Sequence, residues 1–406
     1  MSRYRAEKWQ ISYGVESAYG EAPTGATNAQ YTLGVFDDAT LPDPEFEHTP
    51  YWVMKTGVDR GPSIMYRGKA RYSASIPNIV ILDGRSLVLP IFNDMTHGGA
   101  GQNFTHAAPG ATATSDLPSI KLVAAYYDET GTAGLIRYWS GGKINRATFH
   151  AEEGGMLMMS IDELLFKQVY FGNADDILIS PFYNAAVVSQ TGINFPDNIA
   201  ISGVQHPQEP FYFSECEVKL RVMQFAGSAS TPVEVIIPSV RNFRLEINNN
   251  CTPRYYLNNV GALDDAHGPY EIIEGRREIR LSMQVDLSDY AVGAFSKDDL
   301  FLNLLRQGRQ SPSGLGYTAI QGVAAQIKFQ RANYSTHYIQ FQTPSNYGSE
   351  TFGLNNQGAL IVRAPHNIVP EDLVSVPMEM ICRDVDLYIV DPIQGDGTFP
   401  DRYPIQ

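Results

Sequence analysis

Apolar and polar residues alternate along much of this chain, which predicts β-strands with one buried and one solvated face. The longest alternating run covers residues 278–287, and residues 215–222 and 241–248 alternate in the same way. Strands with one wet face are typical of antiparallel sheets. The pattern therefore predicts an all-β, mainly antiparallel fold with a few short helices.

Helical signals are few. Residues 296–306 predict one helix, because Ser296 and Asp299 form a capping box and Gly308 provides a stop. A similar apolar spacing occurs in residues 83–92. Pro90 interrupts it, so we expect a helix of a turn or two there.

The same order of elements occurs twice along the chain, at an offset of roughly 210 residues. Each copy has a long strand, a short helix and then further strands. The first copy comprises residues 67–76, 83–92, 120–128, 143–151 and 156–162, and the second comprises residues 278–287, 296–306, 323–330, 337–343 and 373–383. A chance match between two β-rich halves is the alternative explanation.

The charge balance limits the possible partners. The chain has 406 residues, a formal net charge of −14 and a pI near 5.0. Its length corresponds to about two to three domains. An acidic surface repels phosphate, which argues against a dedicated nucleic-acid-binding protein. It is compatible with a surface past which nucleic acid slides without sticking.

The start of the chain is charged and polar, and no run of residues approaches the ~18 apolar positions of a membrane span. We therefore expect assembly in a cytoplasm, with no membrane anchor. The three cysteines, Cys216, Cys251 and Cys382, form no CxxC pair and are expected to be inert core thiols.

Catalytic and metal-binding motifs are not found in the sequence. The eight histidines do not stand at metal-ligand spacing from one another or from a cysteine. Adjacent acids such as Asp264 and Asp265 point to opposite faces of a strand and rarely form a catalytic pair. We expect no enzyme activity and no catalytic, cofactor or metal site.

Three segments carry a resemblance to a known family. They are residues 14–23 (GVESAYGEAP), residues 138–155 (YWSGGKINRATFHAEEGG), and residues 240–250 (VRNFRLEINNN) followed by 274–281 (EGRREIRL). In this order, they resemble the tail tube proteins of long-tailed phages, of the type with a doubled tube module.

The resemblance implies two related β-sandwich or barrel modules per chain. They would occupy residues 26–185 and 211–395, with an N-terminal arm (1–25), a linker (186–210) and a C-terminal tail (396–406). It also implies homo-oligomeric rings, trimeric with pseudo-six-fold symmetry, that stack into a virion tail tube. DNA would pass through transiently without specific binding. Other implied partners are the tape measure protein and the tail terminator and baseplate proteins.

The polar faces of two strands are the candidate channel-facing surface: Lys69, Arg71, Ser73, Ser75, Arg280, Ser282, Gln284 and Asp286. We expect their basic residues to form ion pairs with a neighbouring module, and the lining as a whole to be acidic. Candidate ring-stacking elements are the arm, with Tyr13, Glu16 and Tyr19, and a predicted loop at 94–118. A mobile surface segment is the alternative for both.

Other functions remain open at this stage. The chain could be another tail structural protein, such as a distal tail or baseplate hub ring, or a capsid decoration protein. A β-sandwich glycan-degrading enzyme would need two converging carboxylates, for which the sequence offers no convincing pair. A glycan- or solute-binding protein would usually be exported, and the sequence predicts no signal peptide.

Overall fold

The structure is a computed structural model, and it consists almost entirely of antiparallel β-sheet. It describes residues 9–16, 18–20, 31–32, 39–41, 45–51, 64–81, 91, 96–100, 103–108, 117–127, 133–172, 210–226, 229–237, 239–256, 268–286, 324–331, 337–343, 359–365, 373–383 and 385–392. Among these residues, the helical structure is confined to short 3-10 turns such as Phe213–Glu215. The all-β prediction is confirmed.

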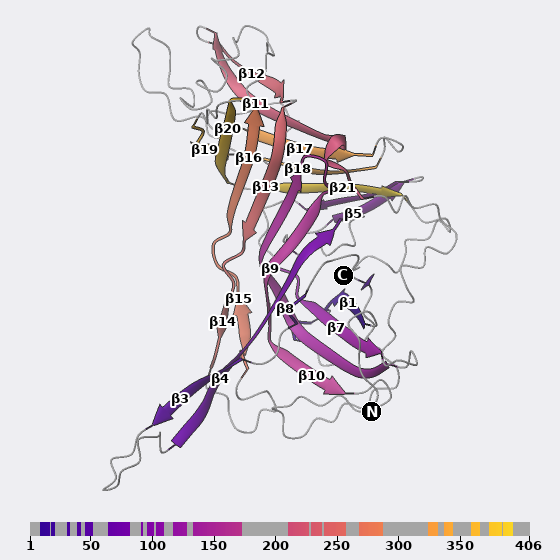
Figure 1. The fold of residues 1–406 in the computed structure, drawn as a ribbon, viewed down its shortest axis with the longest axis vertical. Coiled ribbons are helices and arrows are strands. Elements are labelled where there is room, and N and C mark those ends of the chain that lie inside the picture. The colour runs from indigo at the N-terminus through magenta and orange to yellow at the C-terminus, as the bar shows by residue number, and fades with distance from the viewer. Residues whose placement is uncertain are drawn as a thin grey trace.

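Twelve strands form the larger sheet, which runs through both halves of the chain (Figure 1). They are β1 (Trp9–Val15), β2 (Tyr31–Thr32), β3 (Glu45–Tyr51), β4 (Ile64–Val80), β7 (Ile120–Tyr127), β8 (Ala133–Glu152), β9 (Met158–Phe166), β10 (Gln168–Gly172), β13 (Val240–Asn248), β16 (Glu278–Asp286), β19 (Ala359–Arg363) and β20 (Ser375–Cys382).

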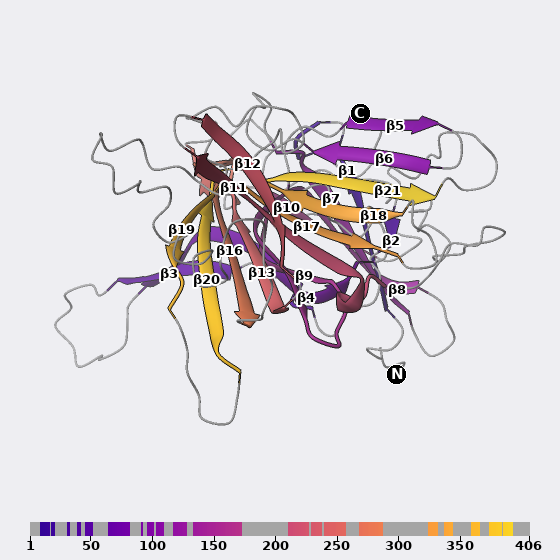
Figure 2. The ribbon, with the colours of Figure 1, turned by 90° about the horizontal axis from the view of Figure 1, so that it is seen from above.

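A second sheet has seven strands, in the order β12-β11-β17-β18-β21-β6-β5 (Figure 2). Their bounds are β12 (Ala229–Ile236), β11 (Cys216–Ala226), β17 (Ala324–Gln330), β18 (Tyr338–Gln342), β21 (Asp386–Pro392), β6 (Asn103–Ala108) and β5 (Thr96–Ala100). A short hairpin of β14 (Thr252–Arg254) and β15 (Glu271–Ile273) stands apart from both sheets.

The strand β8 links the parts of the larger sheet, because its two ends pair with different strands. Its first part pairs with β7 and β10, and its second part pairs with β9 and β13. The pairing of β8 with β13 joins the first half of the chain to the second through seven residue pairs, from Arg146↔Asn248 to Glu152↔Asn242. We call this pairing the junction.

The two halves pair their strands in the same chain order. Apart from the β5–β6 and β14–β15 hairpins, the pairs in the first half are β1·β2, β1·β7, β7·β8, β8·β10, β8·β9, β4·β9 and β3·β4. In the second half they are β11·β12, β11·β17, β17·β18, β18·β21, β19·β20, β16·β20 and β13·β16. Each pairing of the first list has its counterpart in the second, with β18 and β19 together matching the single strand β8.

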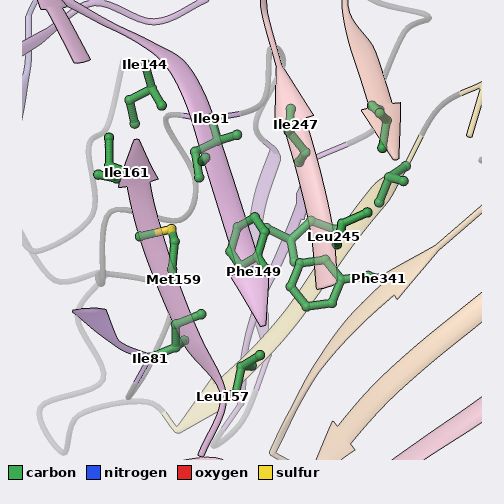
Figure 3. Packing of buried hydrophobic residues seen from close by; sticks show 14 of the residues in the cluster. Ile81, Ile91, Ile144, Phe149, Leu157, Met159, Ile161, Leu245, Ile247 and Phe341 are labelled. Atoms are coloured by element: carbon green, nitrogen blue, oxygen red, sulfur yellow. The ribbon is translucent and has the colours of Figure 1, made fainter. Parts of the chain in front are cut away.

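Residues from both sheets build one main hydrophobic core. The ring of Phe149 on β8 lies 4.9 Å from the ring of Phe341 on β18, with Leu245 of β13 beside them (Figure 3). Phe243 and Phe329 form a second ring contact between the sheets, with centroids 5.6 Å apart. Burial of these large aromatic groups is the main force that holds the sheets face to face.

Most of the predicted strands are present, but three other predictions differ from the structure or lie outside the described residues. Part of the predicted loop 94–118 is in fact the hairpin β5–β6, whose second strand pairs with β21 of the other half. This pairing is non-local, so the local sequence gave no sign of it. The predicted helix 296–306 lies outside the described residues, as does 83–92 except for the buried residue Ile91.

Candidate functional site

A continuous polar face lies on the side of the larger sheet opposite the main core. In β16 the apolar residues Ile279, Leu281 and Met283 are buried, so the alternate side chains point away from the core. Register partners continue this side across the junction, in the row Arg280, Glu246, Thr148 and Ser160. The polar face therefore extends from the second half of the chain into the first.

Most of the predicted channel-facing residues lie on this polar face. On β4, Lys69 and Arg71 are exposed and Ser73 and Ser75 are half-buried. On β16, Arg280 is exposed, and Ser282 and Gln284 are half-buried. The structure therefore brings the two predicted sets, from strands far apart in the sequence, onto one surface of one sheet.

Asp286, predicted as a channel-facing residue, does not share this exposure. The residue is 8% exposed, and its Oδ2 accepts a hydrogen bond from Nε of Arg241 at 2.6 Å. A bulge between Val240 and Asn242 interrupts the register beside it. Asp286 thus ends the strand in a local ion pair.

Ion pairs cover the polar face. Arg71 and Arg146 both contact the carboxylate of Glu163, the latter at 3.6 Å. Nε of Arg244 lies 2.7 Å from Oε1 of Glu246, and Nη1 of Arg280 lies 3.8 Å from Oε1 of Glu379. Exposed pairs of this kind contribute about 0–1 kcal/mol each to stability, so their main effect is on the surface potential.

These pairs correct one expectation about the basic residues. The partners of Arg71 and Arg280 belong to the same half of the chain as the arginines themselves, not to the neighbouring module. The acids Glu163 and Glu379 were not among the predicted site residues. Their positions opposite the arginines depend on strand register, which the local sequence does not specify.

The junction has its own polar contacts on the same side of the sheet. Lys143 of β8 forms an ion pair with Glu274. The backbone N–H of Cys251 donates to Oδ1 of Asn145 at 2.6 Å. A small apolar cluster lies beside these contacts, built from Leu117, Leu165, Cys251 and Ile272. Residues of the second half, around the β14–β15 hairpin, therefore cover this part of the first half.

Two of the three predicted ring-stacking residues of the arm, Tyr13 and Glu16, are buried inside the protein. The strand β1 pairs with β7 along its whole length, and Tyr13 is 1% exposed in the main core. Glu16 is 8% exposed, and its carboxylate accepts hydrogen bonds from the N–H groups of Gly141 and Gly20 at 2.8 and 2.9 Å. Burial raises the pKa of Glu16 to about 7. These two residues cannot contact another ring.

Tyr19 also uses its polar end within the chain. Its hydroxyl oxygen accepts a hydrogen bond from the N–H of Ile272 at 2.8 Å, so it ties the arm to the second half. The ammonium groups of Lys143 and Lys167 lie 5.2 and 5.7 Å from its ring centroid, at cation–π distance. The sequence pattern gave no sign of this burial.

In the described part of the chain, neither the cysteine thiols nor the possible metal ligands are arranged for catalysis. Burial raises the pKa of the Cys216 and Cys251 thiols to about 12, which leaves them protonated and poorly nucleophilic at neutral pH. Within the described ranges, no three His, Cys, Asp or Glu side chains are grouped closely enough to hold a metal ion. No helix in those ranges has the length and apolar character needed to cross a membrane.

No protein-family model matches the chain, and no curated protein matches its sequence. An inference about its function therefore rests on the strand order and the polar face.

Proposed function

We propose that the chain is a structural subunit of a phage tail tube, in which copies form rings that stack around a channel for DNA. The observation that supports this most is the strand-pairing order that occurs twice, with the two halves joined edge to edge at the junction. In this proposal each half is one module, and the junction is one step around the ring. Three chains would supply six modules, with three-fold symmetry.

The polar face would line the channel. It crosses the junction from one module to the other, as a shared lining requires. Four of its arginines, Arg71, Arg146, Arg244 and Arg280, each have a carboxylate within 4 Å, which compensates their positive charge. Local neutralisation within a protein of net charge −14 favours passage of a polyanion without retention.

In this role the protein would need no catalytic group and no cofactor. Its partners would be further copies of itself, the tape measure protein inside the tube, and the terminator and baseplate proteins at its ends. DNA would be a transient passenger. Its location would be the virion tail, after assembly in the host cytoplasm.

Negative-stain electron microscopy of the purified protein over a concentration series tests the proposal. We expect stacked rings or hollow tubes that show three-fold symmetry with six lobes. Closed rings that never stack would instead favour the alternative, a distal tail or baseplate hub protein. A strict monomer that also fails to add to isolated tail tips would count against both.

A further inference from the structure

We infer that copies of the chain join head to tail, with the β3–β4 hairpin of one copy lying over β19 and β20 of the next. This inference rests on the proposed ring and names the surfaces that close it. The inference derives from a contact inside the chain, in which residues of the second half cover β8 and β9 of the first half. The counterparts of those strands, β19 and β20, have no such cover among the described residues.

The registers of the two halves match residue by residue. Arg146 lies opposite Glu163 in the first half, and Arg363 lies opposite Glu379 in the second. A bulge immediately precedes the arginine in both strands. Beyond the bulge, the pair Lys143↔Leu165 corresponds to Leu360↔Ile381. The comparison therefore assigns a counterpart to each position of the covered surface.

The two hairpins also correspond to each other. A Cβ atom added to Gly68 of β4 would lie 3.0 Å from the carbonyl oxygen of Glu47, across the β3–β4 hairpin. A Cβ added to Gly275 would lie 2.7 Å from the carbonyl oxygen of Asn250, across the β14–β15 hairpin. Both glycines therefore mark the same close approach of two backbones.

Counting from these glycines gives the remaining counterparts. Arg71 lies three residues after Gly68, and Glu278 lies three residues after Gly275, so these two residues correspond. The register partner of Arg71 is Glu45 and that of Glu278 is Asn248, so Glu45 corresponds to Asn248. Met65 likewise takes the position of Ile272 in the sequence.

Within the chain, the covered surface is closely packed. Leu165 is 2% exposed because Cys251 and Ile272 lie against it. Its register partner Lys143 is paired with Glu274. The second half thus seals the polar face at this point.

At the corresponding positions of the second half, the side chains are apolar and exposed. Leu360 is 37% exposed, Val362 53% and Ile381 46%, and we call these three residues the edge patch. Apolar groups on the last strand of a sheet favour association with another chain. The occupant that fits by correspondence is the β3–β4 hairpin of a second copy, in the position that the β14–β15 hairpin takes within the chain.

Charge complementarity supports the same arrangement. Arg363 of β19 and Glu45 of β3 are both exposed. Their counterparts, Arg146 and Asn248, are register partners at the junction. In the joined copies, Arg363 would therefore lie opposite Glu45 of the neighbouring copy and form an ion pair with it.

The positions of the two surfaces suit a closed ring. The outer end of β3 and the strand β19 lie toward opposite ends of the long axis of the molecule (Figure 1). Two different, complementary surfaces at opposite ends produce head-to-tail contacts, which close into a ring when the rotation permits.

Paired cysteines directly test the contact between the β3–β4 hairpin of one copy and β19 of the next, which we call the joint. Register partners in an antiparallel sheet are close enough for a disulfide. Arg363→Cys with Glu45→Cys in one chain should give covalent multimers after mild oxidation. A mixture of the two single variants should give covalent dimers. The matched control is Arg146→Cys with Asn248→Cys, which should close within one chain without a gain in mass.

The outcomes separate the joint from the tube proposal. If the control pair closes but the Arg363/Glu45 pair stays uncrosslinked while rings are visible, the joint is wrong and the tube proposal stands. Cross-linked rings that never stack would support the joint and count against the tube. If oxidation gives no covalent multimers, microscopy shows no rings and the chain does not add to isolated tail tips, both fail.

A charged substitution in the edge patch provides a second test. Ile381→Asp should reduce the fraction of chains in rings at least tenfold at the concentration where the natural chain assembles. Ile236→Asp, at a residue 51% exposed on β12, should assemble normally. Circular dichroism should show that both variants fold. If Ile381→Asp assembles like the natural chain, the joint lies elsewhere.

Discussion

Lys143 of β8 is ion-paired with Glu274, and the two side chains are only 8% and 20% exposed. This pair joins the first half of the chain to the second on the polar side of the sheet. A charge that loses its partner in such a place is only partly solvated by water, so the pair is a sensitive point of the junction.

We predict that Lys143→Met destabilises the monomer by about 3 kcal/mol, because Glu274 keeps a half-buried charge without its partner. Urea unfolding followed by fluorescence measures the change. Replacing Glu274 by Gln in the same chain should restore part of the loss. Lys69→Met, at an exposed lysine, should change stability by less than about 0.5 kcal/mol. Equal effects of the two lysine variants would contradict the assigned role of the pair.

Glu16 should make the stability depend on pH. Burial raises its pKa to about 7 from 4.5, although hydrogen bonds from Gly141 and Gly20 and the charge of Lys121 lower it. Between these values the folded state keeps a proton that the unfolded chain has released. The stabilisation is therefore complete below about pH 4.5 and is lost as the pH rises through 7, by about 3 kcal/mol in all.

Unfolding free energies measured from pH 5 to pH 8 test this expectation. The natural chain should become less stable over this range, and Glu16→Gln should largely lose the slope. Glu278→Gln, at an exposed carboxylate, should keep it. An identical slope in both variants would assign the pH dependence to other groups.

Gly141 and Gly154 allow the effect of backbone conformation to be separated from that of crowding. Both have positive φ, +65° and +75°, but a Cβ at Gly141 would lie 2.6 Å from Cβ of Lys167, whereas nothing lies within 4 Å at Gly154. Gly154→Ala should cost about 1 kcal/mol from backbone strain alone. Gly141→Ala should cost about 2 kcal/mol more, because Lys167 in the bend between β9 and β10 must move. Thermal melts of both variants would reveal the difference, and similar melting temperatures would contradict it.

The charges of the polar face should determine whether the assembled protein retains DNA. Glu246→Lys with Glu379→Lys would leave Arg244 and Arg280 without their acids. We expect tubes of this variant to retain double-stranded DNA at low salt and release it at high salt, because the contacts are to phosphate. The same two substitutions to Gln should give weak retention at most. Co-sedimentation with DNA measures it, and no retention by the Lys variant would argue against a lumenal polar face.

The sequence predicted those strands whose residues alternate strictly, such as β13 and β16, because one side of each faces the core. It correctly separated the exposed Arg280 from the buried Leu281. It failed at Asp286, where the strand ends beside a bulge. It also failed for β5–β6, whose small residues have weak β propensity and are held by pairing with the distant strand β21.

The candidate site was predictable only in part, for a related reason. Alternation shows which side chains share a face of a strand, but not which strand lies next to it. The partners Glu163 and Glu379 and the edge patch depend on that order. The motif that contains Glu16 and Tyr19 suggested contacts outside the chain, whereas Tyr19 bonds to Ile272 within it.

The length of β8 has a mechanical consequence. One uninterrupted strand of 20 residues takes part in pairings at both of its ends, so a load on β7 or β10 reaches β9 and β13 through covalent bonds. A pulling force on this sheet would therefore be carried along β8 by the covalent backbone itself, and not only by hydrogen bonds between strands.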